Sequence, residues 1–173
     1  MSTHAAHGRH KRRGERWLAY LPFAVIVLLT MLAATAHQAA GRSWSGVRWM
    51  HDAMGLFLVV FAMFKLFDLR GFADGFQMYD LLAKPFRPWA FVYPFVELAL
   101  GLGYLSQMQP AVIYVATVAV MTWGALGVLR ALAKGLDVHC ACMGTVLKVP
   151  LSTVALVENL GMTAMALGML IAR

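Results

Sequence analysis

The two cysteines of the chain, Cys140 and Cys142, are one residue apart in the sequence HCACMG. Such a pair can exchange with the disulfide of a thioredoxin-like partner, because one thiolate attacks and the other cysteine resolves the mixed disulfide. The flanking His139 and Met143 add an imidazole and a thioether, and sulfur ligands select soft ions such as Cu(I). The motif therefore predicts thiol–disulfide exchange or, alternatively, the handling of a soft metal ion. A third interpretation is two incidental loop cysteines.

A second group of candidate residues lies within or beside apolar segments. Lys65 and Asp68 are three residues apart, which puts both on one face of a helix and lets them pair. A lysine that extends to the lipid headgroups, with an aspartate at the boundary, would be the structural alternative.

Glu97 and Glu158 are the most deeply placed acids. Counting about eight residues inward from Trp89 and from Leu151 puts both carboxyls about 12 Å below the same membrane surface, at about 1.5 Å per residue. An ionised carboxylate at that depth costs several kcal/mol unless it is paired, protonated or hydrated. We therefore expect the two acids, with the adjacent Asn159, to form a polar site near Lys65 that holds a proton. Lys65 could instead neutralise one of the two glutamates, and neutral glutamates bonded to a neighbouring helix are the structural alternative.

The composition says which kind of fold positions these residues. Of the 173 residues, 61% are hydrophobic and 13% are charged, and the mean hydropathy is +0.68. A soluble domain carries about a quarter of its residues as charged types, so a water-soluble globule is excluded. We predict an all-α integral membrane protein, a compact bundle of about five transmembrane helices. Glycines within it, such as Gly101, Gly124, Gly161 and Gly168, are expected to let helices approach closely.

The hydropathy pattern divides the chain into a basic tail, residues 1–16, and a transmembrane domain, residues 17–172. The predicted spans are 17–36, 53–69, 89–106, 111–132 and 151–172. Residues 37–52 read as a polar connection. Between the second and third spans, a short amphipathic helix at the membrane surface is predicted over 71–84, with apolar residues at helical spacing: Phe72, Phe76, Tyr79 and Leu82.

The first apolar segment has two interpretations. Ala34 to Ala36 resemble the small-residue cleavage site of a signal peptide, but the apolar run of about 20 residues exceeds the 7 to 15 usual in signal peptides. A retained first span is therefore favoured over a cleaved one.

The basic residues predict the orientation of the chain. They gather in the tail, in the second connection and around the cysteine motif: Arg9, Lys11, Arg12, Arg13, Arg16, Arg70, Lys84, Arg87, Arg130, Lys134 and Lys148. The other connections hold few, namely Arg42, Arg48 and Arg173. Positive residues stay on the cytosolic side, so we expect a cytosolic N-terminus and a cytosolic cysteine loop in a bacterial inner membrane. The tail then binds anionic lipid rather than nucleic acid.

Several of these motifs together resemble a known family. The first is F-x-x-F-K-L-x-D, from Phe61 to Asp68. The others are the segment from Gly71 to Tyr79, the sequence Pro94 to Glu97, and the C-x-C-M-G sequence that begins at Cys140. Over roughly residues 50–172 the chain resembles the MauE branch of the DoxX-like redox-associated membrane proteins. The resemblance implies a small helical bundle that supports thiol-redox maturation of partner proteins, as in methylamine utilisation.

Overall fold

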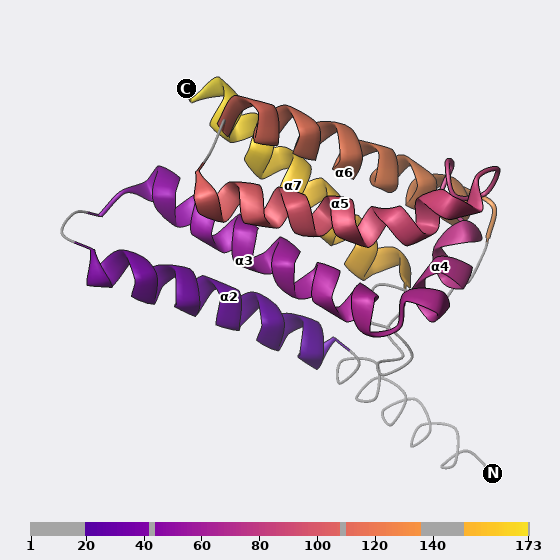
Figure 1. Cartoon of the computed structure of the whole chain (residues 1–173), viewed down its shortest axis with the longest axis horizontal. Coiled ribbons are helices and arrows are strands. Elements are labelled where there is room, and N and C mark those ends of the chain that lie inside the picture. Colours follow the sequence, from indigo (N-terminus) through magenta and orange to yellow (C-terminus); the bar gives the residue numbers. More distant parts are fainter. Residues whose placement is uncertain (1–19, 42–43, 108–109, 136–150, 173) are drawn as a thin grey trace, which may run out of the picture.

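The computed structural model describes residues 20–41, 44–107, 110–135 and 151–172, and these form six α-helices (Figure 1). Five helices are long and apolar enough to cross a membrane: α2 (Leu21–Ala40), α3 (Gly46–Phe67), α5 (Arg87–Ser106), α6 (Pro110–Ala133) and α7 (Leu151–Ile171). The sixth, α4 (Leu69–Gln77), is short. The chain is therefore an all-α integral membrane protein, as predicted. The predicted basic tail lies outside the described residues.

Helix α3 lies between α2 and α5 and packs against both (Figure 1). Helix α6 pairs with α7 and also contacts α5. Helix α2 lies at the edge and leaves most of its long apolar side chains exposed, including Leu28, Leu29 and Leu32. Such side chains suit contact with lipid tails. We call the end at which α3 and α6 finish and α5 and α7 begin the α4 end, because α4 lies there.

Glycines allow the closest helix contacts. A Cβ atom at Gly55 of α3 would lie 2.9 Å from the carbonyl oxygen of Gly101 in α5, and one at Gly101 would lie 3.0 Å from that of Gly55. The two backbones therefore meet at this crossing. At Gly161 and Gly168, by contrast, a Cβ atom would meet nothing within 4 Å, so the expectation that these two glycines mediate close packing is wrong.

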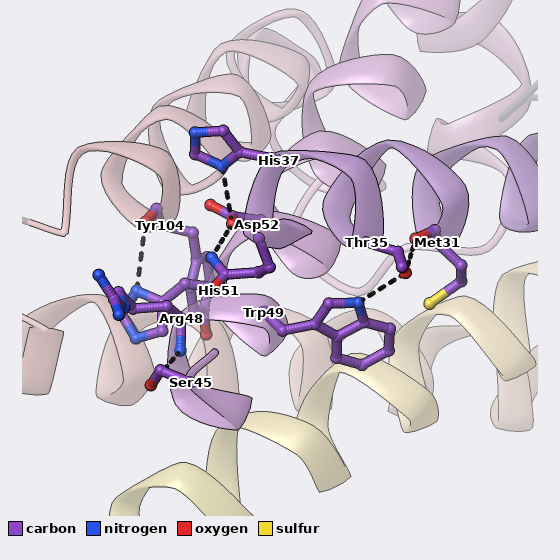
Figure 2. A network of polar contacts seen from close by, with 10 residues as sticks. Met31, Thr35, His37, Ser45, Arg48, Trp49, His51, Asp52 and Tyr104 are labelled. Carbon is purple, nitrogen blue, oxygen red and sulfur yellow. Dashed lines mark hydrogen bonds and ion pairs between the residues drawn. The ribbon is translucent and has the colours of Figure 1, made fainter. Parts of the chain in front are cut away.

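The hairpin of α2 and α3 differs from the polar connection expected over residues 37–52. Helix α2 continues to Ala40, and α3 begins at Gly46, where the side chain of Ser45 caps its first turn by accepting from the Arg48 backbone N–H. Trp49 of α3 donates its indole N–H to the Thr35 hydroxyl of α2 at 3.0 Å (Figure 2). Polar side chains here join two helices, so their polarity does not mark a loop.

Helix α4 carries the aromatic face that the sequence indicates, but it is shorter than the predicted 71–84. Phe72 and Phe76 are buried, and the ring of Phe76 lies 4.6 Å from that of Tyr93 in α5. After Gln77 the chain turns, because Asp80 Oδ1 accepts hydrogen bonds from the backbone N–H groups of the residues two and three positions ahead. The aromatic face therefore packs against the bundle.

Candidate functional site

Lys65, near the C-terminal end of α3, lies at the centre of a buried charge cluster. Its ammonium donates to both carboxylate oxygens of Glu97, at 2.6 and 2.5 Å, and to Oε1 of Glu158 at 3.3 Å. Glu97 comes from α5 and Glu158 from α7, so three membrane-spanning helices meet at one ammonium. The side chains are almost completely buried, with 3%, 0% and 3% of their area exposed. We call these three residues the Lys65 cluster.

Aromatic rings surround the lysine end of the cluster. The Lys65 nitrogen lies 5.9 Å from the ring centre of Phe61, 5.8 Å from that of Phe72 and 5.4 Å from that of Tyr93. Ring faces carry negative charge density, so they attract the almost completely buried ammonium. The rings come from α3, α4 and α5. Helix α4 thus closes the cluster from its own end of the bundle.

The Lys65 cluster contains one basic and two acidic side chains, so its charges balance only if one glutamate is protonated. One ammonium neutralises one carboxylate, so two ionised glutamates would leave a net negative charge in a medium of low polarity, which is costly. The neutral form of the cluster holds one additional proton on Glu97 or Glu158. This arrangement can store a proton, release it and take it up again.

Asn159 lies beside the cluster. It lines a cavity of about 10 Å³ together with Lys65 and Glu158, a volume near the minimum for one water molecule. Its Nδ2 donates to the Ala155 carbonyl at 2.7 Å. Its Oδ1 would lie 2.8 Å from a Cβ atom at Gly124, so α6 approaches α7 closely here because position 124 has no side chain.

Asp68 does not pair with Lys65, and that expectation is wrong. The Asp68 carboxylate instead accepts from the Gly71 backbone N–H at 3.0 Å and caps the start of α4. Helix α3 ends at Phe67, so residues 65 and 68 no longer share one helix face. The buried glutamates then provide the partners of Lys65.

The predicted cysteine motif, His139, Cys140, Cys142 and Met143, lies outside the described residues. The helices that flank it are described: α6 ends at Ala133 and α7 begins at Leu151, both at the α4 end (Figure 1). Glu158 follows the start of α7 by about two turns, which corresponds to about 10 Å along the helix. The Lys65 cluster therefore lies in the half of the bundle that is closer to the α4 end.

Comparison with known families decides the family assignment. The family described as "Methylamine utilisation protein MauE" matches residues 44–172. The chain belongs to the MauE family. The MauE match includes all three residues of the Lys65 cluster and the cysteine motif, whereas α2 lies before it. No curated protein and no solved structure matches the chain.

A second polar group, which the sequence analysis missed, lies where α2 meets α3, at the opposite end of the MauE bundle, and Figure 2 shows its contacts; Gln38, His51 and Asp52 are buried, while His37 is exposed. Asp52 of α3 accepts from Gln38 Nε2 at 2.7 Å and pairs with His37 Nδ1 at 2.9 Å, both from α2. The neighbouring His51 places Nδ1 3.2 Å from the Tyr104 carbonyl and Nε2 against the Tyr114 hydroxyl. A carbonyl only accepts, so Nδ1 of His51 carries the hydrogen.

His51 and Asp52, which are adjacent in α3, join this helix to α2, α5 and α6. The signal in the sequence was a His-Asp pair directly before an apolar run. Continuing the helical pattern of that run toward the N-terminus places the pair inside the helix.

Proposed function

We propose that this MauE-family protein is a thiol–disulfide exchange protein of the bacterial inner membrane, with Cys140 and Cys142 as the exchanging pair. In this proposal it supports the maturation of partner proteins in methylamine utilisation, through a partner with a thioredoxin-like fold. The observation that supports the proposal is the Lys65 cluster, a lysine and two glutamates buried in the half of the bundle nearer the helix ends that flank the cysteines.

The proposed exchange passes two electrons and two protons between the chain and its partner. In the reducing direction, the thiolate of one cysteine attacks the partner's disulfide, forms a mixed disulfide and releases one partner thiolate. The second cysteine then attacks, closes the Cys140–Cys142 disulfide and releases the second partner thiolate. The chain loses two electrons and two protons, and the partner gains them. The oxidising direction runs through the same steps in reverse.

Proton movement gives the Lys65 cluster its proposed role. Two protons accompany the two electrons in each cycle. The proton shared by Glu97 and Glu158 can be passed to a group at the α4 end and later replaced. Lys65 keeps the charge of the cluster balanced in the protonated form.

The exchange is tested by trapping. The chain has two cysteines, so Cys140→Ser and Cys142→Ser each leave a single thiol. One of the two variants should accumulate a mixed disulfide with its partner in membranes, because the resolving thiol is missing. The double variant is the matched control and should form none. Absence of an adduct with either variant, together with unchanged maturation of the partner, would contradict the proposal.

The role of the cluster is tested separately with Glu97. In Glu97→Gln, Lys65 keeps Glu158 as its ionic partner at 3.3 Å, so the protein should fold, but the exchangeable proton is lost. We expect slower resolution of the mixed disulfide in this variant and no better performance in Glu97→Leu. Rates equal to the wild type in both variants would make Glu97 a packing residue.

Handling of a soft metal ion is the competing function, because His139, Cys140, Cys142 and Met143 are also suitable ligands for Cu(I). Among the residues that the structure describes, no group of three or more His, Cys, Asp or Glu side chains could hold a metal ion. Anaerobic titration of the reduced protein with Cu(I) distinguishes the two functions. Tight binding of about one ion, lost in the double cysteine variant, would favour metal handling.

A further inference from the structure

A cavity of about 310 Å³ at the α4 end lies between the turn that follows α4 and the last turns of α6. Three basic side chains line it: Lys84 from the turn, and Arg130 and Lys134 from α6 and the residue after it. No acidic side chain lines it in the described part of the chain. This cavity belongs to neither the Lys65 cluster nor the polar group around Asp52.

The fold brings these three cations together. A Cβ atom at Gly127 of α6 would lie 3.2 Å from the Tyr79 carbonyl oxygen and 3.4 Å from the Asp80 Cα, so the turn lies directly on α6 at this glycine. Arg130 and Lys134 follow Gly127 at helical spacing and occupy the same face one and two turns later. Lys84 ends the turn that packs on that face. The convergence is therefore built into the backbone.

Among the described residues, no ion pair balances the charges of the cavity. None of the three cations forms an ion pair within the described residues, whereas Arg87 at the same end of the bundle pairs with Asp74 at 2.6 Å. Asp80, the acid in the same turn, is buried, and its Oδ1 accepts two backbone hydrogen bonds. Burial raises the pKa of the Asp80 carboxyl, which disfavours negative charge there. The charged side chains that line the cavity in the described part of the chain are thus all positive.

The position of the cavity indicates the kind of anion. Helix α5 begins and α6 ends beside it, so it lies at the level where the spanning helices leave the bilayer. Met78, which lines the cavity, is 53% exposed, and apolar side chains adjacent in sequence to other lining residues are exposed as well: Leu82 at 41%, Phe86 at 60% and Leu132 at 41%. A free inorganic ion makes no use of such side chains, whereas the acyl chains of a lipid do.

We propose that this cavity binds the headgroup of an anionic phospholipid, with its phosphate held by Lys84, Arg130 and Lys134 and its chains on the exposed apolar side chains. Lysine and arginine donate charge-assisted hydrogen bonds to phosphate oxygens. Basic pockets at the ends of spanning helices bind anionic headgroups for this reason.

Native mass spectrometry of the full, delipidated chain tests this site. Each cation near an anionic lipid is worth about five-fold in affinity, so phosphatidylglycerol should bind on the order of 100-fold more tightly than phosphatidylcholine. The variant Lys84→Gln/Arg130→Gln/Lys134→Gln should lose this preference, and Arg130→Gln should lower it about five-fold. The control Arg70→Gln/Arg87→Gln removes two cations from the same end but outside the cavity, and should keep the preference.

Three results would overturn the proposal. The first is equal binding of the two lipids by the wild type, and the second is an unchanged preference in the triple variant. The third is an equal loss of the preference in the control, because the preference would then come from the general charge of this end and not from the cavity. A further arm uses inorganic phosphate. Displacement of phosphatidylglycerol by millimolar phosphate would assign the cavity to a free anion instead. If the triple variant does not fold, as judged by circular dichroism, the effect of Arg130→Gln decides.

Discussion

Lys65 holds the intramembrane site together, because its ammonium contacts carboxyl oxygens from two other helices. Burying such charges costs free energy that their mutual attraction only roughly offsets. The cluster is therefore not a source of net stability when it is compared with an apolar core. Removing one member of the cluster is destabilising, since it leaves an uncompensated charge among apolar groups.

We predict that Lys65→Met lowers the free energy of unfolding by about 3 to 5 kcal/mol, because the glutamates lose their cation. The triple variant Lys65→Met/Glu97→Gln/Glu158→Gln should recover most of this loss, since no charge remains. Denaturant unfolding in detergent micelles measures both. Equal destabilisation in the two variants would mean that packing around Lys65, and not its charge, sets the effect.

Asp80 gives a prediction on pH. Burial raises the pKa of its carboxyl above the ordinary value of about 3.9, against the opposing effect of the backbone hydrogen bonds from Ala83 and Leu82. The folded state therefore binds this proton more tightly than the unfolded state. The contribution to stability is present at low pH and is lost as the pH rises through the raised pKa.

Asp80→Asn keeps an acceptor for the two backbone N–H groups but has no charge to bury. Relative to the wild type, its melting temperature should therefore rise as the pH increases above about 4, the ordinary pKa of an aspartate. Thermal melts of both proteins across this range are the measurement. Parallel curves would show that Asp80 does not titrate with folding.

At the scale of elements, the crossing of α3 and α5 depends on Gly55 and Gly101. A Cβ atom at position 101 would lie 3.0 Å from the Gly55 carbonyl oxygen, 3.0 Å from the Val59 backbone nitrogen and 2.9 Å from a Val59 methyl group. Two of these atoms belong to the backbone and cannot move without shifting the helix. This crossing also sets the distance between Lys65 on α3 and Glu97 on α5.

Gly101→Ala should therefore lower the free energy of unfolding by about 1 to 3 kcal/mol, the usual cost of overpacking. Gly161→Ala is the matched control, because a Cβ atom there would meet nothing within 4 Å and alanine favours helix. It should be neutral or slightly stabilising in the same unfolding assay. A loss of similar size in the control would point to the glycine backbone itself rather than to the crossing.

The helices show where sequence patterns are sufficient. Apolar runs located all five spanning helices, because the membrane requires about 20 apolar residues per span. Polarity misplaced the start of α3, since His37, Gln38 and Asp52 look like loop residues until their partners across the hairpin are known. Lys65 raised the same difficulty. Local spacing offered Asp68 as a partner, while the common depth of the two buried glutamates indicated a site near Lys65. The structure shows that Glu97 and Glu158, on helices far away in the sequence, are the partners.

At the scale of the whole molecule, the two polar groups lie toward opposite ends of the bundle. The Lys65 cluster is nearer the α4 end, and the group around Asp52 is near the end where α2 meets α3. The common depth of Glu97 and Glu158 could be counted from the sequence because both belong to spans with clear starts. The group around Asp52 could not be located in this way, because the helix containing it was predicted to start too late.

The orientation of the bundle gives the last prediction. Most lysines and arginines lie in the tail and at the α4 end, so this end should be cytosolic. A membrane-impermeant maleimide should then label Cys140 and Cys142 only after cells are permeabilised. Ser106→Cys, made in the cysteine-free double variant, is the control, because Ser106 is exposed at the opposite end and should react in intact cells. The reverse pattern would place the cysteine motif outside the cytosol and would restrict its exchange partners to extracytosolic proteins.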